Sequence, residues 1–296
     1  MILLVGATGE LGSRIAERLR DRGSPLRALV RPGSDASKLE ALGVEIARGD
    51  LRDSASVRTA LTGVETVVTT VTAISRALGG EHTATIRDVD GRGNATLVAA
   101  AESAGVQRFV FMSFAQSPVT LKSPLGAAKR STEERIARTS MRGVIVKPEL
   151  FSEIWISKAV GFDWEEGKAQ IFGRGETPNA YVAIDDVAEA VARLALDDDP
   201  PRDVAFGGPD PLTRKQVVRL VEQATGRSIK VRHVPRPMLR MGSVALRRLK
   251  PVQASLMALA LHADTEPSSS AQALHDLGIE PRTVGSYIEE LGRRGA

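Results

Sequence analysis

Short apolar runs alternate with amphipathic stretches along the first half of the chain. The runs at residues 3–5, 26–30, 44–47, 66–71, 109–112 and 144–146 predict buried parallel strands. Apolar residues at helical spacing predict helices over residues 11–22, 36–42, 54–61, 86–104 and 127–139. Because each pair of strands is joined through a helix, we expect an α/β fold of the Rossmann type. This is a doubly wound parallel sheet with helices on both faces.

The pattern loosens after residue 150, where glycine and aromatic residues become frequent. Helices are predicted over 185–196 and 216–224, the latter opened by a capping box of Thr213 and Gln216. Strands are predicted at 204–206 and 229–233, and two short helices within 271–291. We therefore expect residues 1–150, rejoined by 180–200, to form the Rossmann domain. Residues 151–180 and 200–296 are expected to form a smaller C-terminal lobe.

The first apolar run leads directly into three regularly spaced glycines and then into a helix pattern. The segment is Gly6-Ala7-Thr8-Gly9-Glu10-Leu11-Gly12. Gly6 permits the tight turn, Gly9 lets backbone amides approach phosphates, and Gly12 allows close packing of the helix. In this strand–turn–helix context the spacing predicts a cradle for the pyrophosphate of a dinucleotide. Thr8, Glu10 and Leu11 belong to the same cradle.

The residue after the second strand predicts which nicotinamide cofactor is bound. A carboxylate there accepts hydrogen bonds from the adenosine ribose, but this chain has Arg31. A guanidinium pairs bidentately with a 2′-phosphate, so we predict NADP(H) rather than NAD(H). Asp35 is close enough in sequence to reverse this preference if it faces the ribose instead.

Loops after the next two strands are expected to complete the cofactor site. Asp50 and Leu51 follow the third strand, where Asp50 either accepts a hydrogen bond from the adenine amino group or serves as a turn residue. Thr70 and Val71 follow the fourth strand and are predicted to line the pyrophosphate and ribose.

Composition narrows the remaining possibilities. The chain has no cysteine, which excludes disulfides and thiolate catalysis, and its four histidines show no metal-ligand spacing, so no metal site is expected. Aromatic residues make up only 4%, and 40 basic residues face 36 acidic ones, so we expect no nucleic-acid partner. No apolar stretch reaches the roughly 18 residues of a membrane span. We expect a cytoplasmic protein with a small-molecule substrate, and the oligomeric state stays open.

The segment 235–262 combines apolar residues with arginines. Such a segment lies on a membrane surface or covers an apolar ligand. We favour a lid formed by a helix pair, because the arginines are not confined to one helix face.

Several motifs together resemble the atypical short-chain dehydrogenase/reductases of the NmrA-like and isoflavone-reductase-like kind. Besides the glycine segment, the motifs are residues 29–31, 49–51, Asp90-Gly91-Arg92-Gly93-Asn94, 108–113, Lys129, Lys147-Pro148-Glu149-Leu150-Phe151 and 182–188. The superfamily of short-chain dehydrogenase/reductases, which the chain resembles, usually has a Tyr-x-x-x-Lys pair in the active site. Lys129 fits the lysine, but Leu125 stands where the tyrosine is expected. The resemblance also implies that Ser113 either contacts the nicotinamide ribose or satisfies the end of the strand. Pro148 is implied to lie near the carboxamide, and Phe151 either flanks the nicotinamide ring or belongs to the core.

Three interpretations of the missing tyrosine remain. In the first, as the isoflavone-reductase-like branch implies, Lys129 orients the ribose and serves as the acid–base group. In the second, another group donates the proton; the candidates are Ser113, Gln116, His82 and Tyr181. In the third, the chain binds the cofactor without chemistry.

Our leading expectation is an NADPH-dependent reductase of a small, largely apolar carbonyl, quinone or activated alkene. Its substrate cleft is expected among residues 114–125, 151–172 and 235–262, within a substrate-binding lobe. The alternative is a non-catalytic NAD(P)-binding redox sensor or accessory subunit. Epimerase or dehydratase activity on nucleotide sugars ranks third because the tyrosine is absent.

Overall fold

A seven-stranded sheet forms the centre of the first of two compact units in the computed structural model. The structure describes residues 1–81 and 83–295, with side chains described as far as residue 293. The strands are β1 (Ile2–Val5), β2 (Leu26–Val30), β3 (Glu45–Arg48), β4 (Thr66–Thr69), β5 (Arg108–Met112), β6 (Arg142–Pro148) and β10 (Asp203–Phe206). Their order is β10-β6-β5-β4-β1-β2-β3, and the six strands from β6 to β3 run parallel. The predicted doubly wound α/β fold is confirmed.

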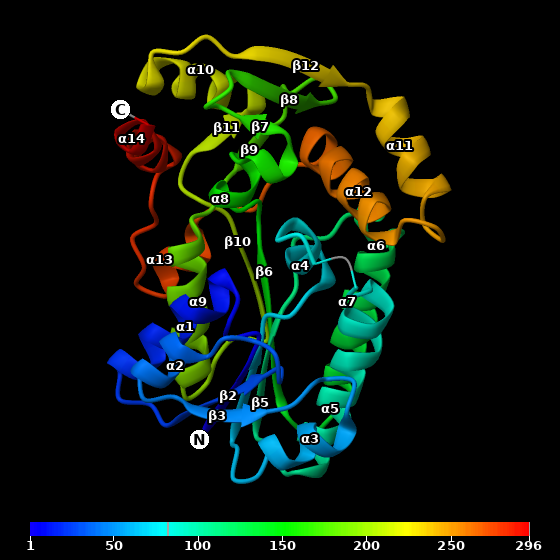
Figure 1. Ribbon diagram of the computed structural model, residues 1–296, viewed down its shortest axis with the longest axis vertical. Helices are drawn as coiled ribbons and strands as arrows, with labels where there is room; N and C mark the ends of the chain where they lie inside the picture. Colours follow the sequence, from blue (N-terminus) through cyan, green and yellow to red (C-terminus); the bar gives the residue numbers. More distant parts are fainter. Residues whose placement is uncertain (82, 296) are drawn as a thin grey trace. The chain divides into compact units, whose positions relative to one another are not determined.

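Helices cover both faces of this sheet. They are α1 (Glu10–Asp21), α2 (Ser37–Ala41), α3 (Ser54–Ala60), α4 (Ala73–Leu78), η1 (Arg87–Gly93), α5 (Asn94–Ser103), α7 (Pro124–Ala137) and α9 (Ile184–Leu196). Figure 1 shows α1 and α9 on one side of the sheet and α3, α5 and α7 on the other. The strand order reverses between β1 and β4, and the crevice beyond such a switch point is where ligands bind.

One predicted helix has a different beginning. The stretch predicted as a single helix over 86–104 starts with the π-helical segment η1, and the α-helix α5 begins only at Asn94. The chain passes very close to the third strand's loop here, since a Cβ on Gly93 would lie 3.1 Å from Leu51 Cβ. The wider helix turns the Asp90 side chain into the interior, where it is fully buried. π-helical turns are frequently found at functional sites.

The second unit consists of Phe114–Gly126, Pro148–Asp186 and the described residues from Ala205 onward. It therefore includes residues 114–126, which the sequence pattern assigned to the Rossmann domain. Its strands are β7 (Phe162–Asp163), β8 (Lys168–Phe172), β9 (Pro178–Ala180), β11 (Pro211–Thr213) and β12 (Lys230–Val234). β8 pairs with β12 in parallel and with β7 antiparallel, and β9 pairs with β11 antiparallel.

The helices of the second unit pack on a core rich in aromatic residues. They are α6 (Pro118–Leu121), α8 (Ser152–Trp155), η2 (Lys158–Val160), α10 (Arg214–Thr225), α11 (Arg236–Ala245), α12 (Pro251–Thr265), α13 (Gln272–Asp276) and α14 (Val284–Gly295). Trp155, Phe162, Trp164 and Tyr181 are buried in this core. The predicted capping box is confirmed, because Gln216 N donates to Thr213 Oγ1 (3.1 Å) and Thr213 N to Gln216 Oε1 (2.8 Å).

Candidate functional site

The loop after β1 meets the loop after β4 at the point where the strand order reverses. Gly6 has a φ of +95°, and a Cβ there would lie 2.7 Å from Thr70 Oγ1 and 3.1 Å from Val71 Cγ1. Only glycine fits both the conformation and the space. Thr70 N donates to Val5 O at 3.0 Å and links the two loops. Gly6, Thr70 and Val71, which the sequence assigned to one site, thus lie together.

The start of α1 offers backbone amides that have no acceptor in the described part of the chain. Gly9 N donates to Gly6 O (3.0 Å), and the helical ladder begins with Ser13 N to Gly9 O (2.9 Å). Within residues 1–81 and 83–295, the amides of Glu10, Leu11 and Gly12 donate to no acceptor. Free amides and the positive end of a helix dipole are the features with which a helix N-terminus binds an anion.

Gly12 and Gly9 have different roles in this turn. A Cβ on Gly12 would lie 2.1 Å from Gly6 O, so the helix start packs directly on the glycine loop. A Cβ on Gly9 would meet only Gly6 O, at 3.3 Å, which leaves the space beside Gly9 open. Thr8 and Glu10 are exposed at this edge, and Leu11 is half-buried. Close packing therefore requires Gly12, whereas Gly9 keeps the approach to the amides clear.

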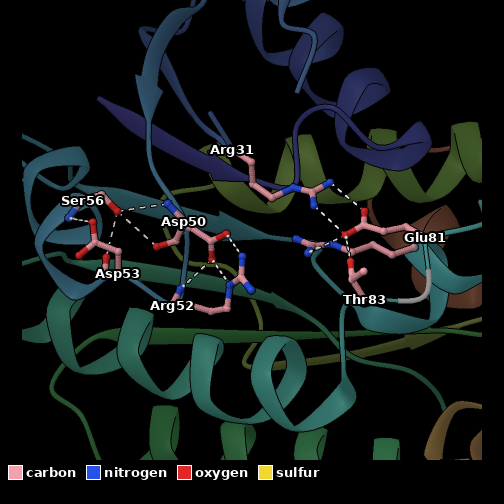
Figure 2. Close-up of polar contacts among 8 residues, drawn as sticks. Arg31, Asp50, Arg52, Asp53, Ser56, Glu81 and Thr83 are labelled. Carbon is pink, nitrogen blue, oxygen red and sulfur yellow. Dashed lines mark hydrogen bonds and ion pairs between the residues drawn. The ribbon is translucent and has the colours of Figure 1, made fainter. Parts of the chain in front are cut away.

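Arg31 is held by a carboxylate that the sequence pattern did not indicate. Figure 2 shows its guanidinium against Glu81, with Nη1–Oε1 at 2.8 Å and Nη2–Oε2 at 3.0 Å. Arg76 lies 3.8 Å from the same carboxylate, and Thr83 donates to it. The hydrogen bonds from Arg31 lower the pKa of Glu81. Two guanidinium groups share one carboxylate here, so the end of β2 keeps a net positive charge.

Arg76 and Glu81 could not be predicted as neighbours of Arg31 from the sequence. They lie about 50 residues after Arg31, and only the folded sheet brings the three side chains together. Asp35, the residue that could have reversed the cofactor preference, caps its own turn by accepting from Ser37 N at 2.9 Å.

Asp50 serves as a turn residue after β3. Its Oδ1 accepts from Arg52 N (2.9 Å), and its two oxygens accept from Arg52 Nε (3.0 Å) and Nη2 (2.8 Å), as Figure 2 shows. These bonds lower the pKa of Asp50, so its carboxylate remains an acceptor. Leu51 beside it is buried. The predicted contact of Asp50 with adenine stays a prediction.

Lys129 is a buried cation in the first unit. Its Nζ donates to Met112 O at 2.8 Å, lies 4.7 Å from the centre of the Phe111 ring and is 3.8 Å from Asp90 Oδ1. Burial lowers the pKa of Lys129 and raises that of Asp90, while their mutual attraction opposes both shifts. Asp90 Oδ2 accepts from Ala73 N at 2.9 Å, whereas Oδ1, 3.8 Å from Lys129 Nζ, has no hydrogen-bond partner among the described residues.

Asp90 is the partner of Lys129 that residue spacing alone did not reveal. In the sequence Asp90 stands out only as part of the motif Asp90-Gly91-Arg92-Gly93-Asn94. It lies 39 positions before Lys129, so residue spacing does not link the two. One turn before Lys129, Leu125 is buried, and its backbone N donates to Ser255 Oγ at 3.1 Å in the second unit. The tyrosine position thus holds an apolar core residue.

The remaining candidates have specific surroundings. Ser113 is buried at the end of β5; its Oγ donates to Glu133 Oε1 at 2.5 Å and its N to Val146 O. Burial raises the pKa of the Tyr181 phenol, which is 2% exposed within the second unit's core. Gln116 is half-buried, and His82 lies outside the described residues.

All three segments predicted to form the substrate cleft belong to the second unit. Pro148 and Phe151 belong there too, and Phe151 forms a bridge with Val182. This unit contains a cavity of about 20 Å³, room for one water molecule. It is lined by Trp155, Phe172, Gly175, Thr177, Asn179, Tyr181, Arg214, Ala260, Ala263 and Asp264.

Known proteins resemble this chain over most of its length. Photosystem II assembly factor Ycf39 of Synechocystis is 28% identical and spans 98% of this chain and 90% of its own. NAD(P)H azoreductase of Xenophilus azovorans is 29% identical over 78% of this chain and 76% of its own. The crystal structure of the NADPH-dependent quinone oxidoreductase QOR2 from Escherichia coli shares the fold, with a TM-score of 0.73 at 23% identity; the likeness covers 98% of this chain and 99% of that one. The sequence profile of the NmrA-like family matches residues 1–288, and the chain therefore belongs to the NmrA-like family.

Proposed function

We propose that this protein is an NADPH-dependent reductase of a small, largely apolar carbonyl, quinone or activated alkene. The observation that carries the proposal is the turn at Gly6–Gly12, where three backbone amides find no acceptor among residues 1–81 and 83–295 and the space beside Gly9 is open. A dinucleotide pyrophosphate satisfies such amides. The chain is similar to proteins named NADPH-dependent quinone oxidoreductase and NAD(P)H azoreductase, which supports the redox assignment.

Basic side chains support the choice of NADPH. Arg31 and Arg76 converge on Glu81 at the end of β2 and leave a net positive charge. A 2′-phosphate, with up to two negative charges, competes with the single charge of Glu81 for Arg31. We propose that Arg31 turns from Glu81 to the phosphate, while Asp50 accepts from adenine and Thr70 and Val71 line the pyrophosphate and ribose.

Lys129 is proposed to act at the nicotinamide end of the site. NADPH, when bound, supplies the hydride, and the protein supplies position and protons. Lys129 Nζ uses one N–H for Met112 O and lies too far from Asp90 for a hydrogen bond, so it retains N–H groups for a ribose hydroxyl. We propose that it holds the ribose and provides a proton to the substrate oxygen, directly or through a water. Ser113, bonded to Glu133, is proposed to contact the same ribose.

A second candidate function is a non-catalytic NAD(P)-binding accessory subunit. Two observations favour it: the buried Leu125 stands where the short-chain dehydrogenase/reductase superfamily usually has its tyrosine, and the relatives include proteins named as assembly factors. Leucine has no proton to transfer, so this position contributes nothing to acid–base chemistry.

Binding and turnover measurements separate the two functions. We expect calorimetry to show NADPH binding, and NADPH consumption with a panel of quinones, azo dyes, enones and aromatic ketones. Lys129→Met, after a check of folding by circular dichroism, should lower turnover roughly a hundredfold. Binding with no consumption across the panel supports the accessory function. Failure to bind either NADPH or NADH contradicts both.

A further inference from the structure

Exposed large apolar side chains gather in one region of the second unit. Six such residues occur in the described part of the chain, and five of them are Val231, Met238, Met241, Val244 and Leu249. Their exposed fractions run from 36% at Val231 to 68% at Met241 and 85% at Leu249. Scattered exposed apolar residues are ordinary, but a cluster of this kind marks an interaction surface.

Helix α11 presents two apolar faces, only one of which is covered. Its inner face packs on α12: Leu239 and Ser243 are buried, and a Cβ on Gly242 would lie 2.2 Å from Met257 Sδ. Met238, Met241 and Val244 follow one another at intervals of three residues and share the outer face. A helix of the surface of a globular protein usually carries polar residues there.

The same region is the most basic part of the chain. Residues 223–263 contain no Asp or Glu but eight Lys and Arg, while the whole chain has a net charge of only +4. These eight are Arg227, Lys230, Arg232, Arg236, Arg240, Arg247, Arg248 and Lys250. Arg236 is paired with Asp264. For Arg240, Arg248 and Lys250, all exposed, the part of the chain that the structure describes provides no carboxylate partner.

We propose that the outer face of α11 and the following turn through Lys250 form a docking surface for an anionic lipid membrane. Apolar side chains enter the boundary between headgroups and acyl chains, and flanking Lys and Arg bind acidic headgroups. A second copy of the chain is a poor occupant, because a symmetric contact would set this basic region against itself. No described helix is long and apolar enough to cross a bilayer, so the proposed contact is interfacial.

Co-sedimentation of the full chain with vesicles tests the proposal. We expect binding to vesicles of phosphatidylcholine mixed with phosphatidylglycerol, little binding to phosphatidylcholine alone, and weakening by salt. Arg240→Gln with Arg248→Gln should weaken binding roughly thirtyfold, since each basic residue near such a surface contributes roughly a fivefold change in affinity. Met241→Ser with Leu249→Ser should weaken it roughly tenfold or more, through loss of apolar burial.

Matched variants show whether the effect belongs to this surface. Leu196→Ser removes the sixth exposed apolar residue, and Arg202→Gln with Arg219→Gln removes the same charge from exposed positions elsewhere. Both should bind vesicles as the unaltered chain does. The proposal is overturned if anionic vesicles do not bind, or if the controls lose as much binding as the variants. It is also overturned if the α11 variants instead break a dimer or change the KM of a substrate without vesicle binding.

Discussion

The buried pair of Lys129 and Asp90 allows a quantitative test of what stabilises the first unit. Nζ and Oδ1 are 3.8 Å apart, and both side chains are at most 5% exposed. At an effective dielectric constant of about 20, two unit charges at this distance attract by about 4 kcal/mol. Removing one member also leaves the other as a buried unpaired charge, which typically costs about 3–5 kcal/mol.

A double-mutant cycle measures this coupling directly. Lys129→Met should lower the free energy of unfolding by about 3–5 kcal/mol, because the buried Asp90 then loses its charged partner. In the Asp90→Asn background the same substitution should cost far less. The asparagine oxygen still accepts from Ala73 N, so the helix contact survives. The expected coupling energy is about 2–4 kcal/mol.

Urea unfolding followed by far-ultraviolet circular dichroism provides the measurement. Tryptophan fluorescence is the internal reference, because both tryptophans, Trp155 and Trp164, lie in the second unit. An exposed pair on the same helix, Arg130 and Glu134 at 3.1 Å, serves as the control cycle and should give about 0.3–0.5 kcal/mol. A coupling between Lys129 and Asp90 no larger than that of the control would refute the electrostatic reasoning.

Three further predictions concern single residues. Gly12→Ala should destabilise the fold by about 2 kcal/mol or more, because the new Cβ meets Gly6 O. Gly285→Ala, whose Cβ would make only an ordinary contact with Thr283 Oγ1 at 3.7 Å, should stabilise it by about 0.4–1 kcal/mol in thermal unfolding. Burial raises the pKa of Glu149 in the folded protein above its ordinary value in the unfolded chain. The free energy of unfolding should therefore fall as the pH rises from the ordinary carboxyl pKa through the raised one. Glu149→Gln should remove this fall when unfolding is measured across that pH range. Glu81→Gln should tighten NADPH binding roughly tenfold in calorimetry and leave NADH unchanged, because it frees Arg31 from its competing carboxylate.

Local patterns predicted the first unit well. The apolar strand runs and the glycine spacing are properties of residues that are close in sequence. The parallel sheet and the turn at Gly6 could therefore be predicted from short stretches of the chain. Element ends differed by one to three residues, and the π-helical η1 was not foreseen. At its end Gly93 lies close to Leu51, a neighbour 42 positions earlier that local patterns do not reveal.

The candidate site was predictable only in part for the same reason. The residues of the cradle at α1 are consecutive in sequence, so the cradle could be predicted. Leu125 lies four residues before Lys129, so the missing tyrosine could be seen in the same way. Glu81 against Arg31 and Asp90 against Lys129 were not predicted as partners, because each pair joins side chains about 40 or 50 positions apart.

The sequence by itself determined the order of strands and helices, the glycine cradle, the missing phenol and the acid-free basic stretch, since each is a property of consecutive residues. The tertiary structure decided which charges are paired and which apolar faces stay open. Asp90 meets Lys129 only where η1 and α7 come together, and α11 exposes Met241 because α12 covers the opposite face. Charge pairing and burial depend on distances in space, and only the folded chain sets those distances.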